Sequence, residues 1–123
     1  MIFQELQQNI EKLVQQFDTI SEDRKLQLEK LSGYIQKKYA DKQTPKLIVI
    51  CTHNSRRSHL GQLWLALAGD YYGLPKLETF SGGTEATAFH PNAIAAVRRI
   101  GFKVEKEASS SKALNTSYKL ISI

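Results

Sequence analysis

The chain of 123 residues has the length of a single domain. Hydrophobic residues make up 41% of it and charged residues 24%, a balance that predicts a folded core and excludes wholesale disorder. Its longest apolar run, Leu47 to Cys51, is far shorter than the roughly 18 residues of a membrane span, and the amino terminus lacks the basic and then apolar order of a secretory signal. Cys51 is the only cysteine, which excludes an internal disulfide and a cysteine-rich zinc cage. We therefore expect a cytoplasmic protein with no membrane association, no metal and no cofactor.

The excess positive charge is distributed unevenly along the chain. The formal net charge is +5, and residues 1–43 contain as many basic as acidic residues, so the whole excess lies in residues 44–123. A basic half indicates an anionic ligand, although a modest excess also serves solubility alone. Nucleic acid is not the expected partner, because the basic residues neither line one helix nor alternate with aromatic residues.

Residues 1–43 are predicted to form two amphipathic helices. Apolar residues recur at spacings of three and four in two segments: Phe3, Leu6, Ile10, Leu13, Val14 and Phe17, then Leu28, Leu31, Ile35 and Tyr39. The residues 18–21 interrupt the pattern, and Thr19 with Glu22 has the spacing of a capping box. We expect an N-terminal helical hairpin packed on the rest of the chain. A scaffold is the simpler interpretation of this hairpin, and a homodimer surface is the functional alternative.

Residues 44–123 are predicted to form an α/β domain. The run Lys46–Cys51 has no polar alternation, as expected for a strand buried on both faces. The remaining elements are a helix from Ser58 to Gly73, a strand Leu77–Phe80, a helix from Pro91 to Gly101, a loop Glu105–Ser117 and a strand Tyr118–Ile123. This order predicts parallel strands joined by right-handed crossovers.

The segment that follows the first strand carries the candidate chemistry. It joins a strand to the start of a helix, so its backbone N–H groups converge at the positive end of the helix dipole and can bind an oxyanion. We expect the loop residues Thr52, His53, Asn54, Ser55 and Arg56 to line this anion site. Cys51 lies at its floor as a thiolate, since cations and helix N-termini lower a cysteine pKa. Arg57 can hold two phosphate oxygens with its planar fork, and Ser58 can donate a hydrogen bond to the sulfur.

These residues resemble the signature of the low-molecular-weight protein tyrosine phosphatases and the related arsenate reductases. Cys51, five residues, Arg57 and Ser58 carry the resemblance. Ser81-Gly82-Gly83-Thr84 is similar to the Ser-Ala-Gly-Thr segment of the family, and His90-Pro91-Asn92-Ala93 with Arg99-Ile100-Gly101-Phe102 is similar to its second helix. The match extends over residues 46–106, about half of the chain.

The resemblance implies a fold and a set of roles. The fold would be a three-layer sandwich around a parallel sheet, here an incomplete, partial phosphatase-like domain in residues 44–123 after the helical hairpin. Cys51 would be the nucleophile, Arg57 would bind phosphate and Ser58 would assist the thiolate. Asn54 and Ser81 would hold the loop in shape by hydrogen bonds.

The chain departs from the family pattern at several positions. His53 stands where relatives usually have a glycine, a residue that adopts the left-handed conformation at no cost. Arg56 replaces a second cysteine, so a protective internal disulfide cannot form. The family's general acid, an aspartate in an Asp-Pro segment, has no counterpart, and the chain ends near the third strand, which predicts a truncated protein.

Three functions remain open at this point. The first is hydrolysis of phosphomonoesters, with protein phosphotyrosine as substrate, through a phosphocysteine on Cys51. The second is reduction of arsenate with an external thiol, because the chain has no further cysteine to resolve an intermediate. The third is a non-catalytic module that binds oxyanions, since the general-acid aspartate is absent.

Overall fold

A computed structural model describes residues 2–85, 88–106 and 118–122, and it confirms an α/β fold. The elements in chain order are the helices and strands α1 (Gln4–Val14), the 3-10 turn η1 (Phe17–Thr19), α2 (Glu22–Ala40), β1 (Lys46–Cys51), α3 (Arg57–Tyr71), β2 (Glu78–Gly83), α4 (Pro91–Arg99), β3 (Lys103–Lys106) and β4 (Tyr118–Ser122). Among the described residues, no helix is both long enough and apolar enough to span a membrane.

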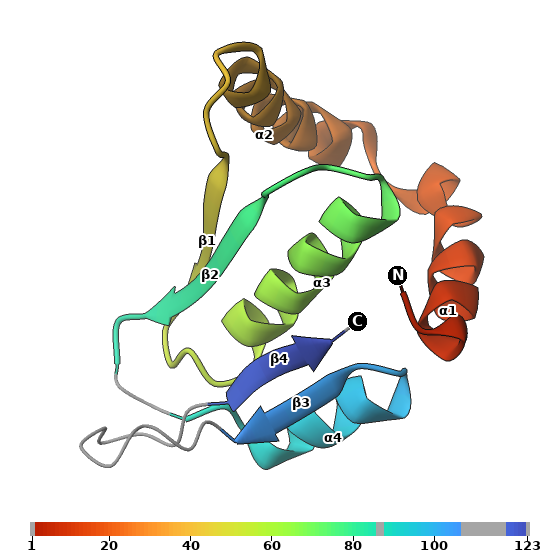
Figure 1. Ribbon diagram of the computed structural model, residues 1–123, viewed down its shortest axis with the longest axis vertical. Helices are drawn as coiled ribbons and strands as arrows, with labels where there is room; N and C mark the ends of the chain where they lie inside the picture. The colour runs from red at the N-terminus through yellow and green to blue at the C-terminus, as the bar shows by residue number, and fades with distance from the viewer. Residues whose placement is uncertain (1, 86–87, 107–117, 123) are drawn as a thin grey trace.

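Two small sheets organise the chain. β1 and β2 are parallel, with Lys46 opposite Glu78 at one end and Cys51 opposite Gly83 at the other. Helix α3 connects them and lies alongside the pair, as Figure 1 shows. This unit of strand, helix and parallel strand is the part of the predicted sheet that is confirmed.

The last strand differs from its prediction. β4 runs antiparallel to β3 in a second two-stranded sheet, so the expected parallel crossover to the first sheet is wrong. The expected loop also begins later, because residues 105–106 belong to β3. Antiparallel neighbours need only a connecting turn, whereas a parallel neighbour needs a longer crossover. The rest of the predicted loop, residues 107–117, and the terminal Ile123 lie outside the described residues.

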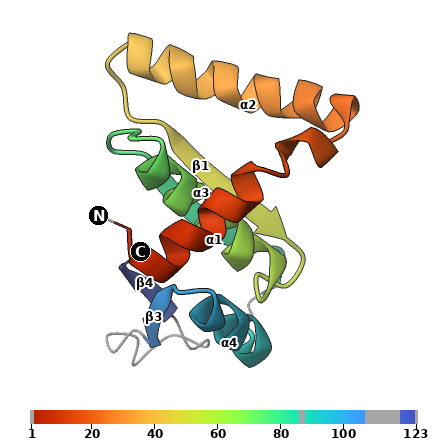
Figure 2. The same cartoon turned by 90° about the vertical axis from the view of Figure 1, so that its right-hand side faces the viewer.

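The hydrophobic core forms between α1, α3 and α4 and includes the start of β3. Its buried members are Leu6, Ile10, Leu63, Leu67, Phe89, Ala93, Ile94, Val97, Phe102 and Val104. Trp64 on α3 packs edge-on against Phe102, with ring centroids 5.6 Å apart. The first predicted helix is therefore an integral part of this core, and Figure 2 shows α1 crossing the face of α3.

Helix α2 is packed differently from its prediction. None of its residues is buried, and the predicted stripe residue Leu28 is exposed. Figure 2 shows α2 running across one end of the molecule rather than alongside α1, so the two helices do not form a closely packed hairpin. Two tyrosines attach it: the Tyr39 hydroxyl donates to the Pro75 carbonyl over 2.8 Å, and the Tyr34 hydroxyl lies 3.5 Å from the Lys46 carbonyl.

Strand β1 is buried on one face only, which corrects the prediction of burial on both. Leu47 is buried and Val49 lies directly under Gly61 of α3, where an added Cβ would approach Val49 to 2.7 Å. Ile48 and Ile50 point the other way and are 59% and 63% exposed. An apolar run does not reveal whether a second layer exists, and no element of the described ranges covers this face.

The predicted helix ends are mostly confirmed. Gly73 and Gly101 follow α3 and α4 with φ of 68° and 116°, the left-handed conformation in which glycine commonly ends a helix. Pro91 is the first residue of α4. The start of α2 is corrected, because Ser21 rather than Thr19 accepts the hydrogen bond from the Arg24 N–H. Residue 19 instead ends the turn η1.

Candidate functional site

The candidate site is the loop between β1 and α3, as the sequence predicted. Cys51 is the last residue of β1, and Arg57 and Ser58 are the first two residues of α3. Asn54 has a φ of 47°, a left-handed conformation that asparagine tolerates better than most residues. The left-handed position in this loop is thus Asn54 and not His53.

Glycine is required where β2 meets this loop. A Cβ added to Gly83 would lie 2.7 Å from the Asn54 nitrogen and 3.0 Å from the Cys51 carbonyl oxygen. Real Cβ atoms do not approach backbone so closely, so only glycine allows the loop to rest against the end of β2. The strand that pairs with β1 therefore also supports the loop.

Hydrogen-bond donors surround the Cys51 sulfur. Its Sγ lies 3.1 Å from the Ser58 hydroxyl and accepts from the Asn54 N–H over 3.2 Å. The pKa of Cys51 is lowered to about 7, mainly by the hydrogen bond from the Ser58 side chain. Partial burial opposes this by raising the pKa, while the backbone N–H groups of Ser58, Asn54 and Ser55 lower it further. A substantial fraction of the thiolate therefore exists at neutral pH.

The Ser58 hydroxyl can serve both protonation states of the sulfur. Ser58 is fully buried, and its hydroxyl donates to the Asn54 side-chain oxygen over 2.7 Å while lying next to Sγ. With a protonated thiol, the S–H donates to this hydroxyl. With a thiolate, the single hydroxyl hydrogen can rotate toward the sulfur instead. Because the same hydroxyl bonds Asn54, a change in the charge of Cys51 alters a hydrogen bond that holds the loop.

The start of α3 adds to the positive potential of the site. The N-cap residue, Arg56, makes no side-chain hydrogen bond to the first N–H groups of the helix. One of them, from Ser58, is directed at Sγ. Unsatisfied N–H groups with the helix dipole behind them favour a bound anion.

The two arginines of the site are exposed. Neither guanidinium makes a hydrogen bond or ion pair with another residue of the described ranges. Arg57 is the first residue of α3, six residues after Cys51, and its side chain is exposed. Its predicted role as the phosphate clamp therefore stays a prediction.

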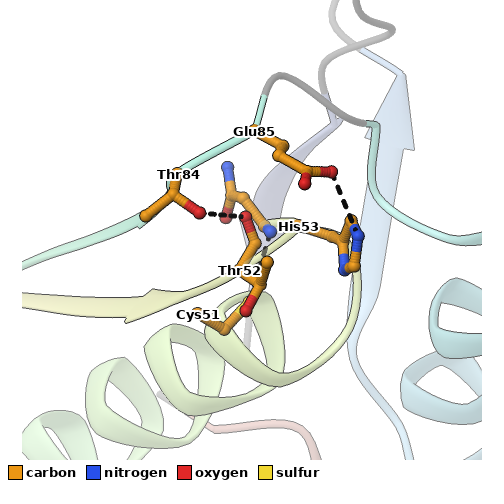
Figure 3. A network of polar contacts seen from close by, with 6 residues as sticks. Cys51, Thr52, His53, Thr84 and Glu85 are labelled. Atoms are coloured by element: carbon orange, nitrogen blue, oxygen red, sulfur yellow. Dashed lines mark hydrogen bonds and ion pairs between the residues drawn. The ribbon is translucent and has the colours of Figure 1, made fainter.

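The segment after β2 lies against the outer side of the loop (Figure 3). The Thr52 carbonyl accepts hydrogen bonds from the Glu85 N–H over 3.0 Å and from the Thr84 hydroxyl over 3.2 Å. The His53 ring nitrogen Nε2 lies 3.1 Å from a carboxylate oxygen of Glu85. His53 thus has a specific partner in this structure.

Ser81 supports the loop indirectly, through a residue that the sequence analysis missed. Its hydroxyl lies 3.3 Å from Nδ1 of His59, whose ring also hydrogen-bonds the Asn54 carbonyl. Burial lowers the pKa of His59, and the Asn54 contact opposes this. The ring stacks on Phe89 at 4.2 Å. No sequence spacing indicates this role, because the contacts join three separate segments.

Ser55 connects the loop to α4. It is buried, and its carbonyl accepts a hydrogen bond from the His90 N–H over 2.7 Å. Among the residues that the structure describes, no three histidine, cysteine, aspartate or glutamate side chains gather as a metal site. The loop is thus tied to β2, α3 and α4 by the contacts of its own residues.

Comparisons with known proteins add no family assignment. No protein-family model, no curated protein and no solved structure matches the chain.

Proposed function

We propose that the chain is a cysteine-dependent phosphatase that hydrolyses phosphomonoesters, with phosphotyrosine in proteins as its substrate class. The observation that carries the proposal is that one sulfur is surrounded by Ser58 Oγ and by three backbone N–H groups, two from the loop and one from the first turn of α3. A structural cysteine needs no such donors, whereas a nucleophile that works at neutral pH does.

The reaction follows from this geometry. The Cys51 thiolate attacks phosphorus in line with the departing oxygen, while the loop N–H groups and the Arg57 fork hold the other phosphate oxygens. The S–P bond forms as the P–O bond to the leaving group breaks. Water then attacks the phosphocysteine, releases phosphate and restores the thiolate, which the Ser58 hydroxyl stabilises.

The proposal includes the finer fold assignment. The parallel unit of β1, α3 and β2, with the loop between the first two, is compatible with a low-molecular-weight phosphatase sandwich. Two features fix the loop against this unit. Gly83 lies close against the backbone of Asn54 and Cys51, and Ser81 contacts His59. The Ser81 contact supports the assignment, because the resemblance implies a loop-holding role for Ser81.

The test is turnover of p-nitrophenyl phosphate, whose leaving group needs little protonation. We expect measurable turnover by the intact chain and a loss of at least about 10³-fold in Cys51→Ser, since the nucleophile is removed. Arg57→Lys should weaken inhibition by vanadate, because lysine cannot replace the bidentate fork. Unchanged activity in Cys51→Ser would contradict the proposal. Phosphate binding without turnover would favour the oxyanion-binding module, and glutathione-dependent arsenate reduction would favour the reductase.

A further inference from the structure

Hydrolysis of a phenyl phosphate ester also needs a proton donor for the departing oxygen. A phenolate is a strong base, and general acids usually accelerate such steps by about 10²–10⁴-fold. The Asp-Pro acid implied by the resemblance is absent from the sequence. Within residues 1–123, a donor for this oxygen would have to be another residue beside the loop.

Among the described residues, Glu85 is the acidic residue that contacts the loop 52–56 between β1 and α3, which we call the anion loop. Its N–H bonds the Thr52 carbonyl, its neighbour Thr84 bonds the same carbonyl, and its carboxylate lies 3.1 Å from His53 Nε2. Both partners of the His53–Glu85 pair remain open to solvent, at 59% and 57% side-chain exposure, so a substrate can reach them. Figure 3 shows the pair at the edge of the loop that Cys51 begins.

The rings of the other histidines in this region make contacts away from the outer edge of the loop. His59 stacks on Phe89 and bonds Ser81 and the Asn54 carbonyl. The ring of His90 accepts the Asn92 N–H at the start of α4. His53 uses one ring nitrogen for Glu85, and its Nδ1 makes no hydrogen bond to any residue in the described part of the chain.

We propose that His53, oriented by the Glu85 carboxylate, is the general acid of the phosphatase reaction, an inference that rests on the proposed function. Glu85 acts as a positioning residue: its carboxylate contacts Nε2 and orients the ring, which leaves Nδ1 as the donor. The histidine at position 53, where relatives usually have a glycine, then has a chemical reason, because it places an imidazole in the anion loop itself.

The proton balance of the cycle is complete. As the P–O bond breaks, its electron pair passes to the leaving oxygen, which takes the Nδ1 proton of the His53 imidazolium. The neutral imidazole then accepts a proton from the water that attacks the phosphocysteine. The S–P bond breaks, phosphate leaves, and both the thiolate and the imidazolium are restored.

The test compares two substrates that differ in the basicity of the leaving group, phenyl phosphate and p-nitrophenyl phosphate. In His53→Asn we expect kcat for phenyl phosphate to fall about 10²-fold or more, and the ratio of the two kcat values to change by at least about tenfold. Glu85→Gln should change the ratio in the same direction by a smaller factor. Glu78→Gln is the matched control, because Glu78 pairs with Lys46 at the opposite end of β2 and should leave the ratio unaltered.

The outcomes separate this inference from the proposed function. An intact chain that does not turn over either substrate overturns both. An active chain whose His53→Asn variant loses both activities equally, or loses neither, overturns the general acid alone. Circular dichroism and phosphate binding of each variant exclude unfolding as the cause of a loss, and Glu85→Gln provides a second test that removes no imidazole.

Discussion

Ser58 is the residue on which the reactivity of Cys51 depends most. Its hydroxyl lies 3.1 Å from Sγ, is fully buried and provides the largest of the effects that lower the pKa of Cys51. The neighbouring Ser55 contributes only its backbone N–H to the sulfur. The two serines therefore offer a direct comparison between a side-chain and a backbone donor.

Replacing Ser58 with alanine should make Cys51 less reactive at neutral pH. The pKa of the thiol rises toward its ordinary value when its main donor is lost, so the thiolate fraction falls. We expect the rate of alkylation by iodoacetamide at pH 7 to fall about fivefold, since a rise of one unit from a pKa of about 7 lowers the thiolate fraction from about one half to about one tenth. The matched control, Ser55→Ala, keeps its backbone N–H and should react like the intact chain. Equal rates for Ser58→Ala and the intact chain would contradict the assigned role.

At the scale of the elements, the loop is shaped by β2 as much as by its own residues. Gly83 faces the Asn54 nitrogen and the Cys51 carbonyl, so the end of β2 fixes where the loop lies. Thr84 and Glu85 then continue from β2 along the loop and bond the Thr52 carbonyl.

Gly83→Ala should therefore disturb the site from outside the loop. The added methyl group has to displace backbone atoms, which costs roughly 1–3 kcal/mol in a packed region, and the ring of donors around Sγ opens. We expect lower thermal stability and weaker protection of Cys51 by phosphate. Gly33→Ala is the control, because an added Cβ there meets nothing within 4 Å, and alanine should raise stability by about 0.5–1 kcal/mol in helix α2. Equal thermal stability and equal protection of Cys51 by phosphate in Gly83→Ala and Gly33→Ala would show that the contact at Gly83 does not shape the loop.

The sequence predicted the elements around the site well because their signals are local. A strand, a polar turn and a helix start follow one another in residues 46–58, and the glycines that end α3 and α4 are adjacent to those helices. The His59–Ser81 contact was not predictable, since the two residues meet only after β1 and β2 pair. The direction of β4 and the exposure of Ile48 depend on which layers assemble, and an apolar run carries no such information.

At the scale of the whole molecule, one helix of the N-terminal pair belongs to the core and the other does not. Leu6 and Ile10 of α1 are buried with residues of α3 and α4, whereas α2 exposes Leu26 and Leu28. The outer face of the β1–β2 pair is also apolar, with Ile48, Ile50 and Phe80 exposed. A homodimer through the N-terminal helices stays a prediction. The anion loop does not depend on it, because the contacts that shape the loop come from within one chain.

The fold keeps a substantial fraction of the Cys51 sulfur ionised at neutral pH by surrounding it with hydrogen-bond donors. Cys51 is the only cysteine, so its ultraviolet thiolate absorbance can be titrated in the intact chain, with Cys51→Ser as the blank. We predict an ionisation midpoint near pH 7, the value to which the surrounding donors lower the pKa of Cys51. A midpoint at about 8.5 or above, the value of an ordinary cysteine, would contradict it.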